Sequence, residues 1–155
     1  SSPSPDLTPD PPPSLAPEQQ PVYEGLKEYW AVTFSFFTDP TQTDVTPLSR
    51  VAESDEVAQL VLMLNKMVEG DWKDDGEIIY RNVNIETPTP LGDTAVTKAY
   101  YCKDLRKVRF LRISTGEEII ENVNSPFVSE VATLQKRSNG TWVVTKISNK
   151  AGSSC

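Results

Sequence analysis

The chain has 155 residues, with 15 Lys and Arg against 22 Asp and Glu, and carries a net charge of −7. Nucleic acids and anionic lipid surfaces are recognised by clustered Lys and Arg, so this balance disfavours both as partners. Histidine is absent, which excludes Ser-His and Cys-His nucleophilic catalysis and nearly every zinc site.

The beginning of the chain is rich in proline. Eight of the first 21 residues are Pro, and no Lys or Arg precedes Lys27. Proline has no backbone N–H to donate, so we predict that residues 1–17 form a disordered, extended tether and that one domain spans residues 18–155. A start of Ser-Ser before Pro, Ser and Asp is similar to a bacterial lipoprotein without its signal and lipidated cysteine. The alternative is an arbitrary boundary within a longer linker.

Residues 18–37 show the clearest helical periodicity. Apolar and aromatic side chains recur there at steps of three and four, at Val22, Tyr23, Leu26, Trp30, Thr33, Phe34 and Phe37. This spacing predicts one apolar stripe, with Tyr29 and Phe36 at its margins, on a helix that lies across a sheet. Asp39 precedes Pro40 and so ends the helix, because a residue before proline is pushed out of helical geometry.

Two further helices are expected before residue 71. Thr46 and Pro47 suit the first positions of a short helix that runs through Val51. Ser54 and the acidic residues after it begin a third helix, which Gly70 ends. The apolar face of this third helix carries Val57, Leu60, Val61, Leu64, Met67 and Val68.

From Trp72 onward the apolar period changes to two, and turn residues separate the segments. We predict strands near residues 77–86, 94–102, 107–114, 126–137 and 141–148, with the last two joined as a hairpin at Asn139-Gly140. Helices come first and strands follow, so the expected class is α+β: three N-terminal helices packed on a bent antiparallel sheet.

Cys102 and Cys155 are the only two cysteines. A disulfide between them would pin the end of the last strand to the sheet, and two cysteines allow one intramolecular pairing only. A free buried Cys102 and an intermolecular bridge through Cys155 are the alternatives.

The acidic residues near the helix-to-strand junction do not match a metal motif. Four of them fall within seven residues, at Asp71, Asp74, Asp75 and Glu77. A calcium loop that starts at Asp71 would need an oxygen ligand where Lys73 stands and a carboxylate where Asn82 stands, so we interpret the segment as a solvated turn. Glycine-rich phosphate loops are also absent. The sequence therefore predicts no metal site and no cofactor.

Lys103, Arg106, Lys107, Arg109 and Arg112 form the one locally positive stretch, which we interpret as the solvated edge of a strand. The aromatic residues offer a different candidate. A helix with many rings across a curved sheet can leave a concave pocket, and we expect such a pocket to be lined by Tyr29, Trp30, Phe34, Trp72 and Tyr80.

The order of the elements resembles the NTF2-like cone fold, also called SnoaL-like or ketosteroid isomerase-like, over residues 18–149. Several short motifs resemble more specifically a group of actinobacterial NTF2-like surface lipoproteins of unknown function. These motifs are Tyr101-Cys102-Lys103-Asp104, Thr115-Gly116, Asn139-Gly140-Thr141-Trp142-Val143-Val144 and the terminal Cys155. In that group the strand cysteine and the terminal cysteine occur as a pair after a low-complexity leader.

The resemblance implies a location but no agreed activity, because the cone fold serves enzymes and binding modules alike. Isomerases of this superfamily use a carboxylate base beside Tyr donors. Tyr29 and Glu86 could mimic that pair, but no motif aligns them, and we assign no catalytic residue.

Our leading hypothesis is a non-catalytic, extracytoplasmic domain, lipid-anchored at the cell surface, that binds a protein of the envelope, secretion or surface machinery. Its contact with the membrane would be through the lipid anchor alone. The alternative is a pocket for a lipid or metabolite, or a vestigial isomerase-like enzyme. A third reading is a purely structural role, in which the domain acts as a spacer or as a unit that forms a homodimer through the sheet.

Overall fold

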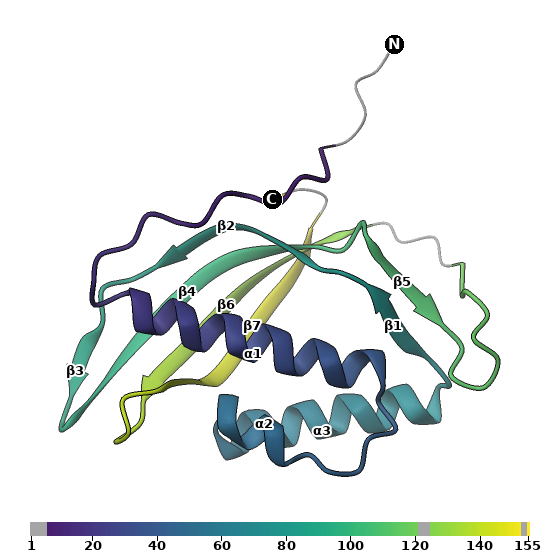
Figure 1. The fold of residues 1–155 in the computed structure, drawn as a ribbon, viewed down its shortest axis with the longest axis horizontal. Coiled ribbons are helices and arrows are strands. Elements are labelled where there is room, and N and C mark those ends of the chain that lie inside the picture. Colours follow the sequence, from purple (N-terminus) through teal and green to yellow (C-terminus); the bar gives the residue numbers. More distant parts are fainter. Residues whose placement is uncertain (1–5, 121–124, 153–154) are drawn as a thin grey trace.

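A computed structural model describes residues 6–120, 125–152 and Cys155. In this part of the chain three helices precede seven strands (Figure 1), as the α+β class requires. The helices are α1 (Gln20–Thr38), α2 (Thr46–Val51) and α3 (Ser54–Glu69). The strands are β1 (Lys73–Gly76), β2 (Ile79–Ile85), β3 (Thr89–Leu91), β4 (Thr94–Asp104), β5 (Val108–Leu111), β6 (Phe127–Lys136) and β7 (Trp142–Gly152).

The main sheet is antiparallel, with strands in the order β2-β4-β6-β7 and β3 paired with β4 beyond the end of β2. The sheet curves around α1, and all three helices lie on its concave side (Figure 1). Successive residues of a strand point to opposite faces, so Tyr101 and Lys103 of β4 face the helices, whereas Cys102 and Asp104 face outward. One strand therefore serves both faces of the sheet.

Helix α1 is rotated slightly from the predicted stripe. Tyr29 and Phe36, expected at the margins, are 6% and 2% exposed, whereas Phe34 and Phe37 are only half-buried. Phe34 and Phe37 line a cavity between the helix and the sheet, and Phe37 also packs against the core. One side of the apolar stripe of α1 is therefore buried in the core, and the other side faces the cavity.

The strand predicted over residues 107–114 is shorter in the structure than expected, and it does not belong to the main sheet. Val108–Leu111 forms β5, which pairs with β1 in a separate two-stranded ribbon. The sequence does not predict β1, because its residues Lys-Asp-Asp-Gly carry no apolar side chain and suit a turn. The interpretation of residues 103–112 as a solvated edge is also wrong in part, since Lys103 lines the cavity and Arg106 is bonded to a buried carboxylate.

Cys102 and Cys155 form the predicted disulfide, with Cα atoms 5.8 Å apart. It joins β4 to the end of the chain on the outer face of the sheet. At the other end, residues 6–16 have no helix or strand, in keeping with their proline content. They run along the outside of β2 (Figure 1), so this part of the expected tether lies against the domain.

Candidate functional site

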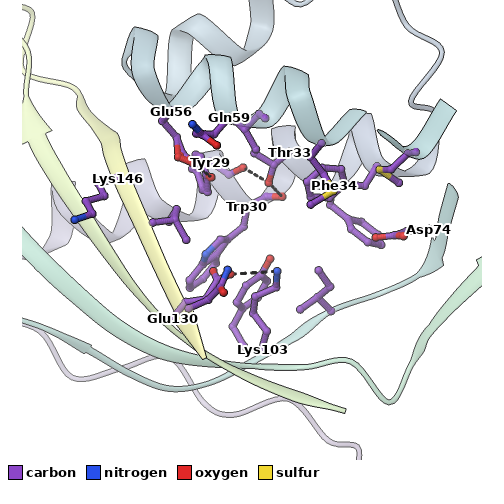
Figure 2. A pocket seen from close by; sticks show the side chains of 18 of the residues that line it. Tyr29, Trp30, Thr33, Phe34, Glu56, Gln59, Asp74, Lys103, Glu130 and Lys146 are labelled. Atoms are coloured by element: carbon purple, nitrogen blue, oxygen red, sulfur yellow. Dashed lines mark hydrogen bonds and ion pairs between the residues drawn. The ribbon is translucent and has the colours of Figure 1, made fainter. Parts of the chain in front are cut away.

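A cavity of about 930 Å³ lies between α1, α3 and the concave face of the sheet (Figure 2). The five side chains named as pocket-lining from the sequence are all at its wall: Tyr29, Trp30, Phe34, Trp72 and Tyr80. Small-molecule sites typically enclose roughly 300–1,000 Å³. The cone is therefore large enough for a ligand, and Trp30 does not fill it.

The aromatic wall of the cavity is ordered by ring contacts. Trp30 stacks on Tyr80 with ring centroids 3.7 Å apart and planes 9° apart. The ring of Tyr101 makes edge-to-face contacts with both, with its centroid 5.0 Å from that of Trp30 and 5.8 Å from that of Tyr80. Trp30 comes from α1 and the two tyrosines from β2 and β4, so the rings join the helix to the sheet and form one apolar wall.

Glu56 brings a carboxyl group to the helical side of the cavity. It lies in the first turn of α3 and is 7% exposed, and Tyr29 Oη donates to its Oε1 over 3.4 Å. Burial disfavours the charged form and raises the pKa of Glu56 to about 7, with a smaller contribution from the negative charge of Glu130. Burial also raises the pKa of Tyr29, which remains a neutral donor.

Glu130 supplies a second carboxylate from the sheet. Tyr101 Oη donates to its Oε1 at 2.7 Å, and Lys103 Nζ is 3.4 Å from its Oε2. Figure 2 shows Glu130 and Lys103 side by side across the cavity from Tyr29 and Thr33. The pair fixes a negative and a positive group in the concave face, while Tyr101 anchors the carboxylate.

Asp74 is a third acid at the wall, although we interpreted its segment as a solvated turn. It lies on β1, and burial raises its pKa to about 6, against the opposing effect of Lys103. Its neighbour Asp75 faces the other way and pairs with Arg109. Alternation along a short strand therefore separates one buried acid from a solvated one.

The sequence alone does not single out the polar groups of the cavity, namely Glu56, Asp74, Lys103 and Glu130. The signals for two of them were present. Glu56 is four residues before Leu60 on the buried face of α3, and Glu130 is in phase with Ala132 on β6. Glu86, which we had paired with Tyr29, lies outside the cavity and accepts a hydrogen bond from Tyr100.

In the described part of the chain, no three Cys, Asp or Glu side chains are grouped so that they could hold a metal ion. The cavity therefore offers carboxyl, ammonium and phenol groups in an aromatic setting. These groups can bind an organic ligand by charge, hydrogen bonds and ring stacking, and Glu56 can exchange a proton near neutral pH.

Glu56→Gln is expected to change how stability depends on pH. The folded-state pKa of Glu56 is raised above its ordinary 4.5, so the native protein binds more protons than the unfolded chain between about pH 4.5 and 7, and stability falls as pH rises through that window. The variant should lose this slope. Urea unfolding at pH 5 and pH 8 measures it, with Glu69→Gln at the exposed end of α3 as control. Parallel curves for wild type and E56Q would contradict the assignment.

Comparison with known proteins supports the fold and nothing finer. No family model matches the chain, and no curated protein matches it. Among solved structures, the intermembrane space region of the chloroplast protein ARC6 is similar with a TM-score of 0.58 at 10% identity, over 90% of this chain and 100% of that one. A structure from Catenulispora acidiphila has a TM-score of 0.50 at 11% identity, over 86% and 93% of the two chains.

A ketosteroid isomerase-like protein from Erwinia carotovora atroseptica is more distant, with a TM-score of 0.44 at 12% identity over 88% of this chain and 98% of that one. Identities this low speak to the fold alone. None of the helices in the described ranges is long and apolar enough to cross a membrane. The chain folds as an NTF2-like cone, with three N-terminal helices packed on a bent antiparallel sheet.

Proposed function

We propose that the cone binds a small organic molecule with an apolar body and a protonated amine, and that it does so without catalysing a reaction. The observation that carries this proposal is the cavity itself, in which two buried carboxyl groups, Glu56 and Glu130, face a wall of stacked rings. Rings and carboxylates together suit a cation with an apolar body, because each stabilises one end of it.

The charges at the wall favour a cation over an anion. Four acids line the cavity against two lysines: Asp55, Glu56, Asp74 and Glu130 against Lys103 and Lys146. One lysine, Lys103, is already paired with Glu130. Part of the raised pKa of Glu56 comes from repulsion by Glu130, so a bound ammonium would relieve that repulsion and lower the pKa. Binding at pH 7 should therefore release protons.

The test is calorimetric titration with octylamine, 1-octanol and octanoate, which share one chain length and differ in charge. We expect octylamine to bind about tenfold more tightly than octanol, which corresponds to about 1.4 kcal/mol, and octanoate to bind least. Glu56→Gln should remove most of the preference for the amine and abolish the proton release, seen as a heat that depends on the buffer. Equal binding of all three compounds, or none, would overturn the proposal.

Two tryptophan variants on α3 test whether the ligand binds in the cavity or on the outer surface of the helix. Ala58 lines the cavity and Leu62 does not, although both are exposed on the same helix one turn apart. Ala58→Trp should narrow the cavity and weaken octylamine binding, whereas Leu62→Trp should leave it unchanged. If both variants bind like the wild type, the ligand lies elsewhere.

A second candidate function is binding of a protein in the cell envelope, by a domain that is extracytoplasmic and lipid-anchored at the cell surface. Apolar side chains exposed on α3 favour it, since Leu62 and Val68 are 54% and 46% exposed. The disulfide fits an oxidising compartment, and the ARC6 region, which has a similar fold, is from an intermembrane space. Crosslinking in the native cell should recover a protein partner with the wild type and less of it with Leu62→Glu.

The homodimer through the sheet also stays a prediction. Sedimentation velocity at several protein concentrations checks it, and a constant monomer would rule it out.

A further inference from the structure

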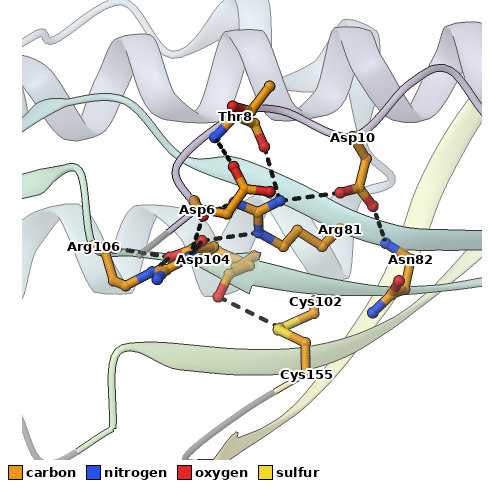
Figure 3. A network of polar contacts seen from close by, with 10 residues as sticks. Asp6, Thr8, Asp10, Arg81, Asn82, Cys102, Asp104, Arg106 and Cys155 are labelled. Atoms are coloured by element: carbon orange, nitrogen blue, oxygen red, sulfur yellow. Dashed lines mark hydrogen bonds and ion pairs between the residues drawn. A yellow bond between two sulfur atoms is a disulfide. The ribbon is translucent and has the colours of Figure 1, made fainter. Parts of the chain in front are cut away.

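Residues 6–13, which we call the strap, are held against the outer side of the edge strand β2 by a set of directed hydrogen bonds (Figure 3). The donors come from three residues of the domain, Arg81, Asn82 and Arg106. The acceptors on the strap are backbone carbonyl oxygens and one carboxylate. Five hydrogen bonds between donors of the domain and acceptors of the strap indicate that the strap is bound at a specific site.

The two arginines are positioned by a buried carboxylate. Asp104 is fully buried at the end of β4, and its Oδ2 accepts from Arg81 Nε at 2.9 Å and from Arg106 Nη2 at 2.7 Å. These bonds hold the pKa of Asp104 well below its usual range, with Arg106 as the larger cause. Asp104 therefore fixes both guanidinium groups with their remaining N–H groups directed outward, toward the strap.

The outward donors match the backbone of an extended chain. Arg81 Nη2 and Arg106 Nη2 both donate to the carbonyl oxygen of Asp6, at 3.0 and 2.9 Å. Arg81 Nη1 donates to the carbonyl oxygen of Thr8 at 2.9 Å. Carbonyl recognition of this kind requires an extended backbone but no particular side chain, so it sets the course of the strap.

Asp10 adds side-chain specificity. Its Oδ1 accepts from Arg81 Nη1 at 3.0 Å, and its Oδ2 accepts from the backbone N–H of Asn82 at 3.0 Å. Asn82 has φ of +55° and lies where the register of β2 against β4 shifts, between Arg81 and Asn84. The irregularity leaves this amide directed at the carboxylate, and a bulged edge strand commonly re-aims a group in this way.

The proline run of the strap then covers a small hollow beside the aromatic rings. Pro11, Pro12 and Pro13 line a space of about 240 Å³ together with Tyr23, Trp30, Tyr80 and Val83. Trp30 and Tyr80 also form the stacked wall of the large cavity. The prolines thus lie behind the same two rings that a ligand in the cone would meet. Because prolines donate no backbone hydrogen bond, the strap covers the edge of β2 without adding a strand.

We propose that the outer edge of β2 is a recognition site for an extended, acidic, proline-containing segment, and that residues 6–13 of the same chain occupy it and close the back of the cone. Arg81 and Arg106 bind the backbone carbonyl groups of the segment. Arg81 and the backbone amide of Asn82 bind the carboxylate of Asp10, and the prolines pack beside the rings of Trp30 and Tyr80. The site is a peptide-binding surface along the edge strand β2 that shares only the rings of Trp30 and Tyr80 with the ligand cavity, and it does not depend on the ligand proposal.

Amide hydrogen exchange measured by NMR on the full chain tests the proposal, with Asn82 as the reporter. In the wild type the Asn82 amide should be protected, and Asp10→Ala should raise its exchange rate about tenfold or more, because its acceptor is gone. Asp93→Ala, an exposed turn acid, is the matched control and should change nothing. The core amide of Ala132 on β6 should keep its protection in both variants, which shows that the fold is intact. Unchanged Asn82 exchange in D10A would overturn the proposal.

A peptide of residues 6–15 tests the recognition site directly. Added to Asp10→Ala protein, the peptide should restore protection of Asn82, whereas the same peptide with its own Asp10 replaced by alanine should not. The wild type should bind the peptide much more weakly, since its site is filled. Equal binding by wild type and variant, or no restored protection, would count against the site. Asn82 protection that rises with wild-type concentration would overturn the assignment within one chain and show that a second copy supplies the strap.

Discussion

Asp104→Ala is expected to lower the free energy of unfolding by about 3 kcal/mol, the lower end of the cost of removing one partner from a buried ion pair. The carboxylate is fully buried and holds two guanidinium groups, and the side chains of Arg81 and Arg106 are only 13% and 27% exposed. Without Asp104, Arg106 would lose its charge partner at a site largely shielded from water, and Arg81 would keep only the more exposed carboxylate of Asp10. Urea unfolding at pH 7 measures the loss.

Two further variants and a pH series make this result specific. Asp104→Asn keeps the shape of the side chain and one acceptor oxygen, so its free energy of unfolding should fall by less. Asp93→Ala, in an exposed turn, should leave the free energy of unfolding almost unchanged. The folded-state pKa of Asp104 lies below its ordinary 3.8, so its contribution is complete above that pH and is lost as the pH falls toward the folded-state pKa. A loss in D104A no larger than in D93A would show that the buried pair adds no net stability.

Removing the disulfide is expected to cost about 4 kcal/mol in the chain-entropy model for a loop of this length. Cys102 and Cys155 are 53 residues apart in sequence, and the bond is the covalent link between the last residue and the sheet. Cys155→Ser should show the loss in urea unfolding, and reduction of the wild type should reproduce it. The exposed position of Cys155 means that the substitution itself creates no cavity.

The control for this experiment is reduction of Cys155→Ser, which should change nothing further. Intact mass of the unreduced wild type should be lower than that of the reduced chain by one pair of hydrogen atoms. A covalent dimer or two reactive thiols in the native, unreduced protein would contradict the intramolecular bond.

The fold was largely predictable because its elements are strongly periodic. The predicted helix over 18–37 corresponds to α1, and the predicted strands 94–102 and 126–137 correspond to β4 and β6. The missed elements, β1 and β3, have four and three residues, and their sequences are polar or contain proline. Such short segments become strands only because a neighbouring strand offers them hydrogen bonds, and local sequence does not record that neighbour.

The candidate site was predictable only in its apolar part. Large rings such as Trp30 and Tyr80 are conspicuous in sequence, and a wall of rings follows from a helix laid across a sheet. The acids were not singled out because a surface Glu and a buried Glu look alike. Whether Glu56 or Glu130 is buried depends on the phase of its element relative to the sheet, and that phase is set by packing.

By itself the sequence determined the α+β class, the one available cysteine pairing, the absence of histidine chemistry and the aromatic character of a pocket, because composition and periodicity are local properties. Only the tertiary structure decided which carboxyl groups share the cavity and where the proline-rich segment lies. Lys103 and Asp104 are adjacent in sequence yet serve opposite faces of the sheet, one at the cavity and one beneath the strap. Alternation along a curved strand, joined to contacts between residues as distant as Asp6 and Arg106, creates that division.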